Sequence, residues 1–220
     1  LNANTESILH ESRDGKVLTY FINVGRDFPG KLARILEENI AIDISAFDSA
    51  KAQSGIRIVT LEQSGRDELP LSEEIARQKA DIIRNLLNSG HPFTQVFLDS
   101  LPPNYWLEEI SIVLQRSRID RHLRLFAQAM ATDRVVTFLE EAEDGAFGYR
   151  RGQKELRLGI AAKNADLSVV INILKLFERR GVNLNRSYYD VFVDKNTKEK
   201  IAILSLYVID KGYDLQTLIS

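Results

Sequence analysis

The chain contains no cysteine, so disulfide bonds, thiolate zinc sites and a cysteine nucleophile are all excluded. No apolar run approaches the roughly 18–20 residues that a membrane-spanning helix needs, and no secretory signal pattern opens the chain. An excess of one charge is also lacking, because 29 Lys and Arg residues are balanced by 31 Asp and Glu residues. A net charge of −2 does not favour a nucleic-acid binder. We therefore expect a cytoplasmic protein that binds neither membrane nor nucleic acid.

The motifs of common catalytic sites are missing as well. There is no G-x-G-x-x-G after a strand, no P-loop, no H-E-x-x-H and no G-x-S-x-G. The histidines are scattered, without a partner at metal-ligand spacing: His10, His91 and His122. The acids in 140–144 lack the spacing of a calcium loop, and acids interleave the basic groups of 116–124 and 150–154, so all three segments are interpreted as solvated surface. We assign this chain no catalytic residue, no metal ligand and no cofactor of its own.

Hydrophobic spacing predicts a β-α-β-β-α-β unit over residues 16–99. The expected strands are 16–24, 40–46, 56–62 and 93–98, and the expected helices are 29–38 and one that Ser72 caps and Gly90 ends. This order is that of the ferredoxin-like, split βαβ fold. Residues 1–15 are polar and aperiodic and are interpreted as a leader or linker, so the first module is assigned to 16–100.

The same pattern recurs in the second half of the chain. Pro102 and Pro103 open a helical linker, 101–133, with two expected helical runs, and a second module follows over 134–220. Its expected elements are strands 134–139, 156–161, 182–193 and 201–207, a helix that Asp166 caps and Gly181 ends, and the start of another helix. The residues Leu32, Ile35, Ile40 and Ile42 align at one offset with Leu174, Phe177, Val182 and Leu184.

We therefore expect an α+β protein of two tandem ferredoxin-like modules with a helical insert, the second module being incomplete. The chain begins with Leu1 instead of Met and ends in an apolar-periodic run, so we also expect it to be a piece of a longer polypeptide.

The turn between the first strand and the first helix resembles that of the ACT domain, a regulatory family. The resemblance lies in an acid, then Pro-Gly, then an apolar helix face: Asp27-Phe28-Pro29-Gly30-Lys31-Leu32-Ala33-Arg34-Ile35-Leu36. It implies modules that pair side by side, bind an amino acid at their interface and regulate an enzyme of amino-acid metabolism. The equivalent turn of the second module, 162–166, lacks Pro-Gly.

This turn also supplies the candidate effector site. The unpaired N–H groups of a helix N-terminus can hold a carboxylate, and Asp27 or Asp43 could face an ammonium group. The candidate residues are Gly25, Asp27, Pro29, Gly30, Lys31 and Asp43. The alternative is that Pro29 and Gly30 only begin a helix.

A second resemblance concerns residues 157–208. The runs 157–161 and 177–190 are similar to the region ahead of the catalytic part of large NAD-specific glutamate dehydrogenases, which carry ACT-like modules at their N-terminal side. This implies a non-catalytic regulatory fragment, with NAD bound elsewhere in the parent enzyme, and a homo-oligomer formed through sheet edges. A free-standing amino-acid sensor or scaffold is the alternative, and a small enzyme on a ferredoxin-like sheet is a third hypothesis.

Overall fold

The computed structural model describes residues 7–23, 28–51, 56–65, 70–102, 105–106, 112–142 and 155–209. Its eight strands form one antiparallel sheet in the order β1-β2-β4-β3-β7-β8-β6-β5. The strands are β1 (Ser7–Glu11), β2 (Val17–Asn23), β3 (Ile44–Lys51), β4 (Ile56–Gln63), β5 (Val136–Glu141), β6 (Glu155–Lys163), β7 (Leu184–Val193) and β8 (Lys200–Ile209). The α+β class is therefore confirmed.

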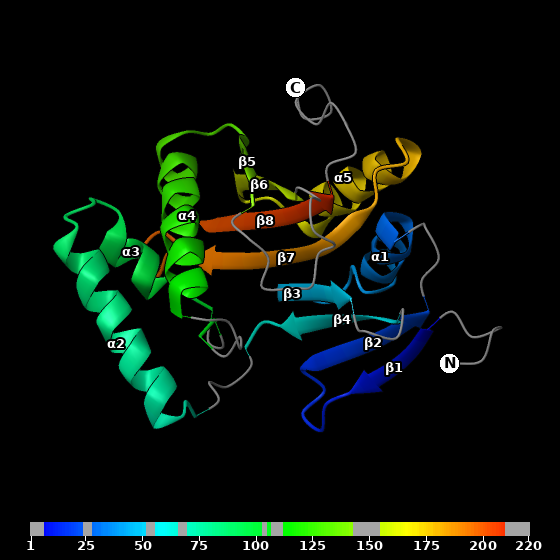
Figure 1. Cartoon of the computed structure of the whole chain (residues 1–220), viewed down its shortest axis with the longest axis horizontal. Helices are drawn as coiled ribbons and strands as arrows, with labels where there is room; N and C mark the ends of the chain where they lie inside the picture. Colours follow the sequence, from blue (N-terminus) through cyan, green and yellow to red (C-terminus); the bar gives the residue numbers. More distant parts are fainter. Residues whose placement is uncertain are drawn as a thin grey trace.

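Within the described residues, five helices form two groups, one against each face of the sheet (Figure 1). They are α1 (Phe28–Glu38), α2 (Glu73–Asn88), α3 (Thr94–Asp99), α4 (Ile112–Ala131) and α5 (Leu167–Arg179). α1 and α5 pack side by side, and an ion pair between Glu37 and Lys175 joins them. α2, α3 and α4 form the other group, so the protein has three layers.

Each face of the sheet contributes to its own hydrophobic core. In β6, Leu158 and Ile160 pack into the core under α1 and α5, whereas Ala161 packs into the core under α2, α3 and α4. Alternation along a strand sends successive side chains to opposite faces, and both faces of this strand are covered. The strand accordingly reads as a nearly continuous apolar run instead of an alternating one.

The sheet order is unchanged when the two halves of the molecule are exchanged. In chain order the first half (residues 7–63) is β1-β2-α1-β3-β4, and the second half (residues 136–209) is β5-β6-α5-β7-β8. Strands β3 and β7 pair at the centre, with Phe47 opposite Tyr189 and the ring centroids 5.3 Å apart. The offset that relates Leu32 to Leu174 also relates Phe47 to Tyr189. A pseudo-twofold axis therefore passes between these two rings.

Most of the elements expected from hydrophobic spacing are present. β2, α1, β4, α2, β5, β6, α5, β7 and β8 each overlap the predicted element of the same type. The predicted caps are also confirmed: the Ser72 side chain accepts from Ile75 N, and the Asp166 side chain accepts from Ser168 N. Gly90 and Gly181 follow their helices in the left-handed conformation, where an L side chain is strained.

The prediction of a strand at 93–98 is wrong, because this segment forms helix α3. Phe97 is fully buried between Phe126 of α4 and Phe192 of β7, with ring centroids 5.5 and 5.3 Å apart. Phe93, Val96 and Phe97 recur at helical spacing and pack into the same core. Tertiary packing thus outweighs the strand preference of this aromatic segment.

The interpretation of the N-terminal segment as an aperiodic leader is wrong for residues 7–11. They form β1, which pairs with β2 from Ser7 opposite Ile22 to Glu11 opposite Leu18. A tight turn closes this hairpin, with Gly15 in the left-handed conformation and its N–H donating to Ser12 O. All five residues of β1 are exposed, so ladder hydrogen bonds hold the strand and no apolar pattern reveals it.

Strand β1 also takes the edge position of the first module that was expected for the strand at 93–98. It lies beside β2, where the last strand of a ferredoxin-like unit would lie, and β5 lies beside β6 in the second half. Each half therefore has four strands, and α2 belongs to the opposite layer. Two smaller differences from the predictions remain. Residues 40–43, expected to begin a strand, form turns ahead of β3. The linker was expected to contain two helical runs, and its described residues contain one helix, α4. The start of another helix that is expected at the end of the second module lies outside the described residues.

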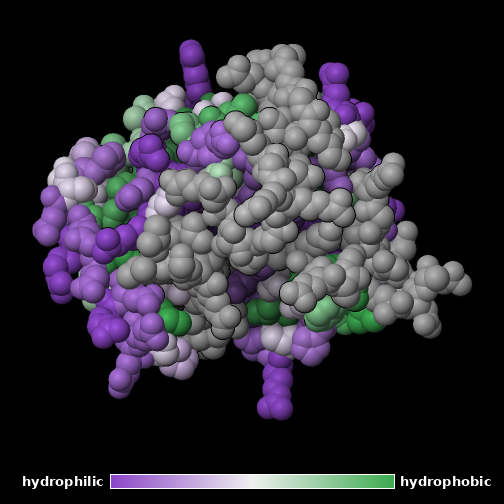
Figure 2. Space-filling model, in the orientation of Figure 1, coloured by the Kyte–Doolittle hydropathy of each residue, from purple (hydrophilic) through white to green (hydrophobic). Residues whose placement is uncertain are grey.

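On the face seen in Figure 2, the coloured residues are mostly hydrophilic, and apolar ones form small separate patches. Within the described part of the chain, every helix is too short or too polar to span a bilayer.

Candidate functional site

A cleft of about 510 Å³ opens where the two halves meet. The first half contributes the connection between α1 and β3, residues 40–44, and the second half contributes the turn between β6 and α5, residues 164–168. Tyr189 and Val191 of β7 and Lys200 of β8 complete the lining. This volume lies within the range of small-molecule sites.

Hydrogen bonds fix the connection that carries Asp43. Asn39 at the end of α1 is buried, and its side-chain amide donates to Tyr20 Oη (2.8 Å) and to Ile35 O (2.7 Å). Further along, Ser64 N donates to the backbone oxygen of Asp43 (2.7 Å). The backbone of Asp43 is therefore held while its carboxylate stays exposed, 3.5 Å from Lys200 Nζ.

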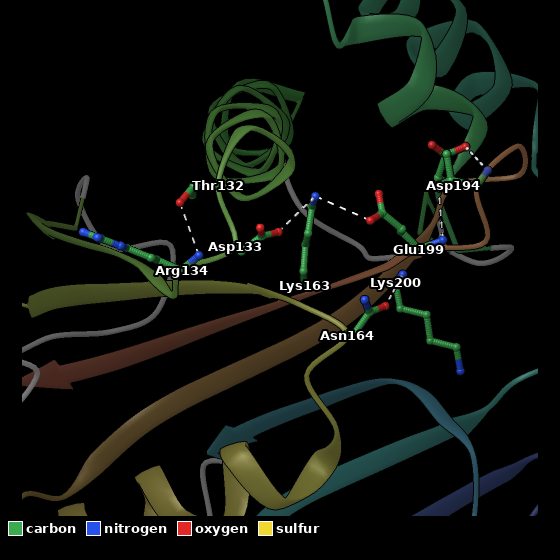
Figure 3. A network of polar contacts seen from close by, with 9 residues as sticks. Thr132, Asp133, Arg134, Lys163, Asn164, Asp194, Glu199 and Lys200 are labelled. Carbon is green, nitrogen blue, oxygen red and sulfur yellow. Dashed lines mark hydrogen bonds and ion pairs between the residues drawn. The ribbon is translucent and has the colours of Figure 1, made fainter.

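The opposite wall is the turn before α5. Asn164 adopts a left-handed conformation, with φ of 49°, which Asn tolerates better than most residues. Its N–H donates to Lys200 O (2.7 Å), and Lys200 N donates to Asn164 Oδ1 (3.2 Å). Figure 3 shows this link, with the Lys163 ammonium directed away from it toward Asp133 and Glu199. The turn is thus tied to β8, the strand that carries Lys200.

Asp166 is ionised at neutral pH. The Ser168 hydroxyl and the Ser168 N–H both donate to its carboxylate and lower its pKa. As the N-cap of α5, the carboxylate also lies at the positive end of a helix. A fixed negative charge therefore stands on the second-half side of the cleft, opposite Asp43 of the first half.

Tyr189 lines the cleft beside the pseudo-twofold axis. Its ring is buried against Phe47, and burial raises the pKa of its hydroxyl, with further contributions from Asp166, Asp43 and Asp190. The hydroxyl is therefore protonated at every physiological pH and can donate a hydrogen bond. Asp43 and Asp166 both act on it electrostatically, so the acids of the two halves converge on one group.

The lining combines charge with apolar surface. Two carboxylates and one ammonium leave a net negative charge, and the remainder is largely apolar: Ile40, Ile42, Ile44, Leu167 and Val191. Such a lining can hold a small molecule that carries a cationic group and an apolar part. A zwitterion can in addition place its carboxylate against Lys200.

The pseudo-equivalent position on the other side of the axis is filled by Arg57. The ladders pair Arg57 with Lys51 and Lys200 with Val193, so Arg57 and Lys200 correspond. Arg57 is buried, lies 4.1 Å from the Phe28 ring centroid, and donates to the backbone oxygens of Leu184 and Asn185. The cleft is thus one of two positions that the pseudo-twofold axis relates. Arg57 fills one of them, whereas the exposed Lys200 leaves the other open.

The predicted site residues are only partly brought together. Pro29, Gly30 and Lys31 form the first turn of α1, and Pro29 and Gly30 are buried. Asp43 follows the other end of this helix, which is about 16 Å long at about 1.5 Å per residue for its 11 residues. Gly25 and Asp27 lie outside the described residues. Asp43 instead shares the cleft with the second turn, the one that lacks Pro-Gly.

Five polar residues of the cleft were not predicted as site residues: Asn164, Asp166, Ser168, Tyr189 and Lys200. The internal repeat marks 162–166 as the counterpart of the first turn, and Asp166 is recognisable as a helix cap. The pairing of β3 with β7, which brings Asp43 to that turn, has no local signal in the sequence.

A second group of polar side chains is buried between α4 and the sheet. Arg118 pairs with Asp190 (3.0 Å), and Arg157 pairs with Glu140 (2.7 Å). His122, also buried, lies 2.8 Å from the Tyr105 hydroxyl through Nδ1. In the part of the chain that the structure describes, no three His, Asp or Glu side chains are placed to hold a metal ion. These groups are therefore paired within the protein, and the Arg118–Asp190 ion pair attaches α4 to β7.

Comparisons with models of known protein families, with curated proteins and with solved structures found no match for this chain.

Proposed function

We propose that this chain is a regulatory, non-catalytic module that binds an amino acid in the cleft between its two halves. The observation that carries the proposal is that charged groups of both halves, Asp43 on one side and Asp166 and Lys200 on the other, line one cleft of about 510 Å³. The ammonium group of the effector lies near Asp43 and Asp166, its carboxylate near Lys200, and its side chain against the apolar wall.

Regulation follows from the position of the cleft. A ligand that contacts both halves binds best to the arrangement that presents both sets of groups, so it raises the population of that arrangement. The β3–β7 ladder and the α1–α5 contact join the halves. A small change in the packing at either contact would be transmitted to the enzyme that is attached to this module.

The attached enzyme in this proposal is a large, cytoplasmic NAD-dependent glutamate dehydrogenase. This part rests on the resemblance of residues 157–208 and of the ACT-like turn alone. The parent enzyme would hold NAD and the residues for oxidative deamination of glutamate outside this chain. The same cleft would serve a free-standing amino-acid sensor equally well.

Thermal unfolding of the 220-residue chain in the presence of each of the twenty amino acids tests the proposal. An effector at 100 times its dissociation constant adds about 2.7 kcal/mol to the free energy of unfolding. Asp43→Asn should weaken binding of that effector about tenfold, because a charged hydrogen-bond partner is lost. Asp81→Asn, on α2 and outside the cleft, is the matched control and should leave the affinity for the effector unchanged. A panel without any shift would refute amino-acid binding.

A further inference from the structure

The position that the pseudo-twofold axis relates to the cleft holds an arginine side chain of the chain itself. The Arg57 guanidinium donates to the backbone oxygens of Leu184 and Asn185 and lies 4.1 Å from the Phe28 ring centroid. A guanidinium carries five N–H donors in a planar fork, so it reaches two neighbouring acceptors at once. Arg57 is only 6% exposed, so this arrangement keeps an arginine side chain almost entirely out of water.

The open cleft presents the corresponding backbone segment. At the offset of the internal repeat, Leu184 and Asn185 correspond to residues 42–43, and both of these residues line the cleft. Asp43 also carries a carboxylate, whereas Asn185 carries a neutral amide. The first-half wall of the cleft is therefore more favourable to a cation than the wall that already accepts Arg57.

The charges of the cleft leave one cation to be supplied. Asp43 and Asp166 contribute two carboxylates from opposite walls, and Lys200 contributes one ammonium group. The Lys200 side chain is 47% exposed, so it does not fill the cleft as Arg57 fills the related position. One further cationic side chain would neutralise the cleft.

Exposed apolar side chains lie on both sides of the cleft. Ile40, which belongs to the first-half wall, is 55% exposed, and Val169, which follows Ser168 of the other wall, is 37% exposed. Exposed apolar groups that adjoin a polar slot are typical of a surface that contacts another protein. They offer a contact to the residues that flank an inserted side chain.

We propose that the cleft receives an arginine side chain from an exposed segment of a partner protein, in the way that Arg57 fills the related position. The guanidinium lies between residues 40–44 and the first turn of α5, where it meets Asp43 and Asp166. The apolar neighbours of that arginine pack against Ile40 and Val169.

This occupant gives amino-acid binding a direct regulatory effect. The guanidinium of the partner and the ammonium group of an effector use the same carboxylates, Asp43 and Asp166, so the two ligands exclude each other. The effector therefore releases the partner segment. This step rests on the proposed function, whereas docking of the arginine does not.

The probe for docking is the tripeptide Leu-Arg-Leu with an acetylated N-terminus and an amidated C-terminus, which has no free ammonium or carboxylate group. Backbone amide shifts of the ¹⁵N-labelled 220-residue chain should change in residues 40–44 and 164–168 and saturate. The same peptide with citrulline in place of arginine keeps the shape without the charge and should bind at least about tenfold more weakly. Equal affinities of the two peptides, or shifts that leave both segments unchanged, would overturn the proposal.

A variant of the cleft tests the contact from the side of the protein. Asp166→Asn removes one carboxylate but keeps a residue type that caps helices well, so α5 is retained. It should weaken binding of the arginine peptide about tenfold, and Asp81→Asn on α2 should leave this affinity unchanged. The same affinity in both variants would contradict docking at Asp166.

The arginine peptide and the free amino acids test different claims. Binding of the peptide without binding of any amino acid would support docking and refute the effector, and the reverse result would refute docking alone. An unchanged peptide affinity in saturating effector would overturn mutual exclusion. A wild-type dimer in sedimentation velocity that the peptide dissociates would place a second copy in the cleft and overturn the assignment to a different protein.

Discussion

His122 shows how burial gives a residue a role that its sequence position does not indicate. It lies among the charged residues of α4, yet it is only 2% exposed. Tyr105 and Phe192 contact its ring, and Arg118 and Arg121 of α4 and Arg157 of β6 lie near it. Burial lowers its pKa well below 6.5, and the three arginines lower it further. The folded protein therefore holds His122 neutral.

This makes stability depend on pH in a defined direction. Below the ordinary pKa of 6.5, His122 binds a proton in the unfolded chain but not in the folded one, so the free energy of unfolding falls as pH falls. The expected contribution of this residue is up to ~1.4 kcal/mol per pH unit. Urea unfolding at several pH values, followed by fluorescence of the single, buried Trp106, measures it.

The matched variants are His122→Gln and His91→Gln. His122→Gln should remove this part of the pH dependence, and His91→Gln, at a partly exposed turn, should retain it. Equal slopes for wild type and His122→Gln below pH 6.5 would contradict the assignment.

At the scale of elements, the segments with a clear amphipathic period and explicit caps were predictable. α2 and α5 begin at their predicted caps because Ser72 and Asp166 satisfy free N–H groups of the first turn. α3 was not predictable, since residues 93–98 are rich in types that favour strands and become helical only through their packing. β1 was not predictable either, because backbone pairing and not apolar burial holds it.

Phe97 should accordingly be the residue on which α3 depends. Phe97→Ala removes a ring packed against Phe126 and Phe192 and should lower the free energy of unfolding by about 3–5 kcal/mol. Gln95→Ala, on the exposed side of α3, should cost less than about 0.5 kcal/mol. Urea unfolding curves of the two variants give the comparison. Similar losses for both would mean that α3 is not anchored through Phe97.

At the scale of the whole molecule, the repeat was predictable but the joining of its copies was not. One offset relates Leu32 to Leu174 in the sequence, and it also superposes the ring pair Phe47 and Tyr189 across β3 and β7. Nothing in either copy tells which strand edges meet. The location of the cleft therefore required the structure, because Asp43 and Asp166 become neighbours only through that junction.

The pseudo-twofold relation predicts unequal roles for two equivalent cations. Arg57→Ala leaves the backbone oxygens of Leu184 and Asn185 without this donor and uncovers Phe28, and should cost about 1.5–3 kcal/mol of stability. Lys200→Ala removes an exposed ammonium and should cost no more than about 1 kcal/mol, while weakening effector binding. Denaturant unfolding tests this, and equal losses would contradict the assignment of one filled and one open position.

The central claim, that an amino acid binds between the halves, is tested most directly by NMR. Backbone amide shifts of the ¹⁵N-labelled chain are followed while the amino acid with the largest thermal stabilisation is added. The predicted changes concentrate in residues 40–44 and 164–168 and at Lys200, and Asp43→Asn reduces them. Shifts confined to the first turn of α1 around Gly30 and Lys31, or saturating shifts that leave residues 164–168 unchanged, would contradict it.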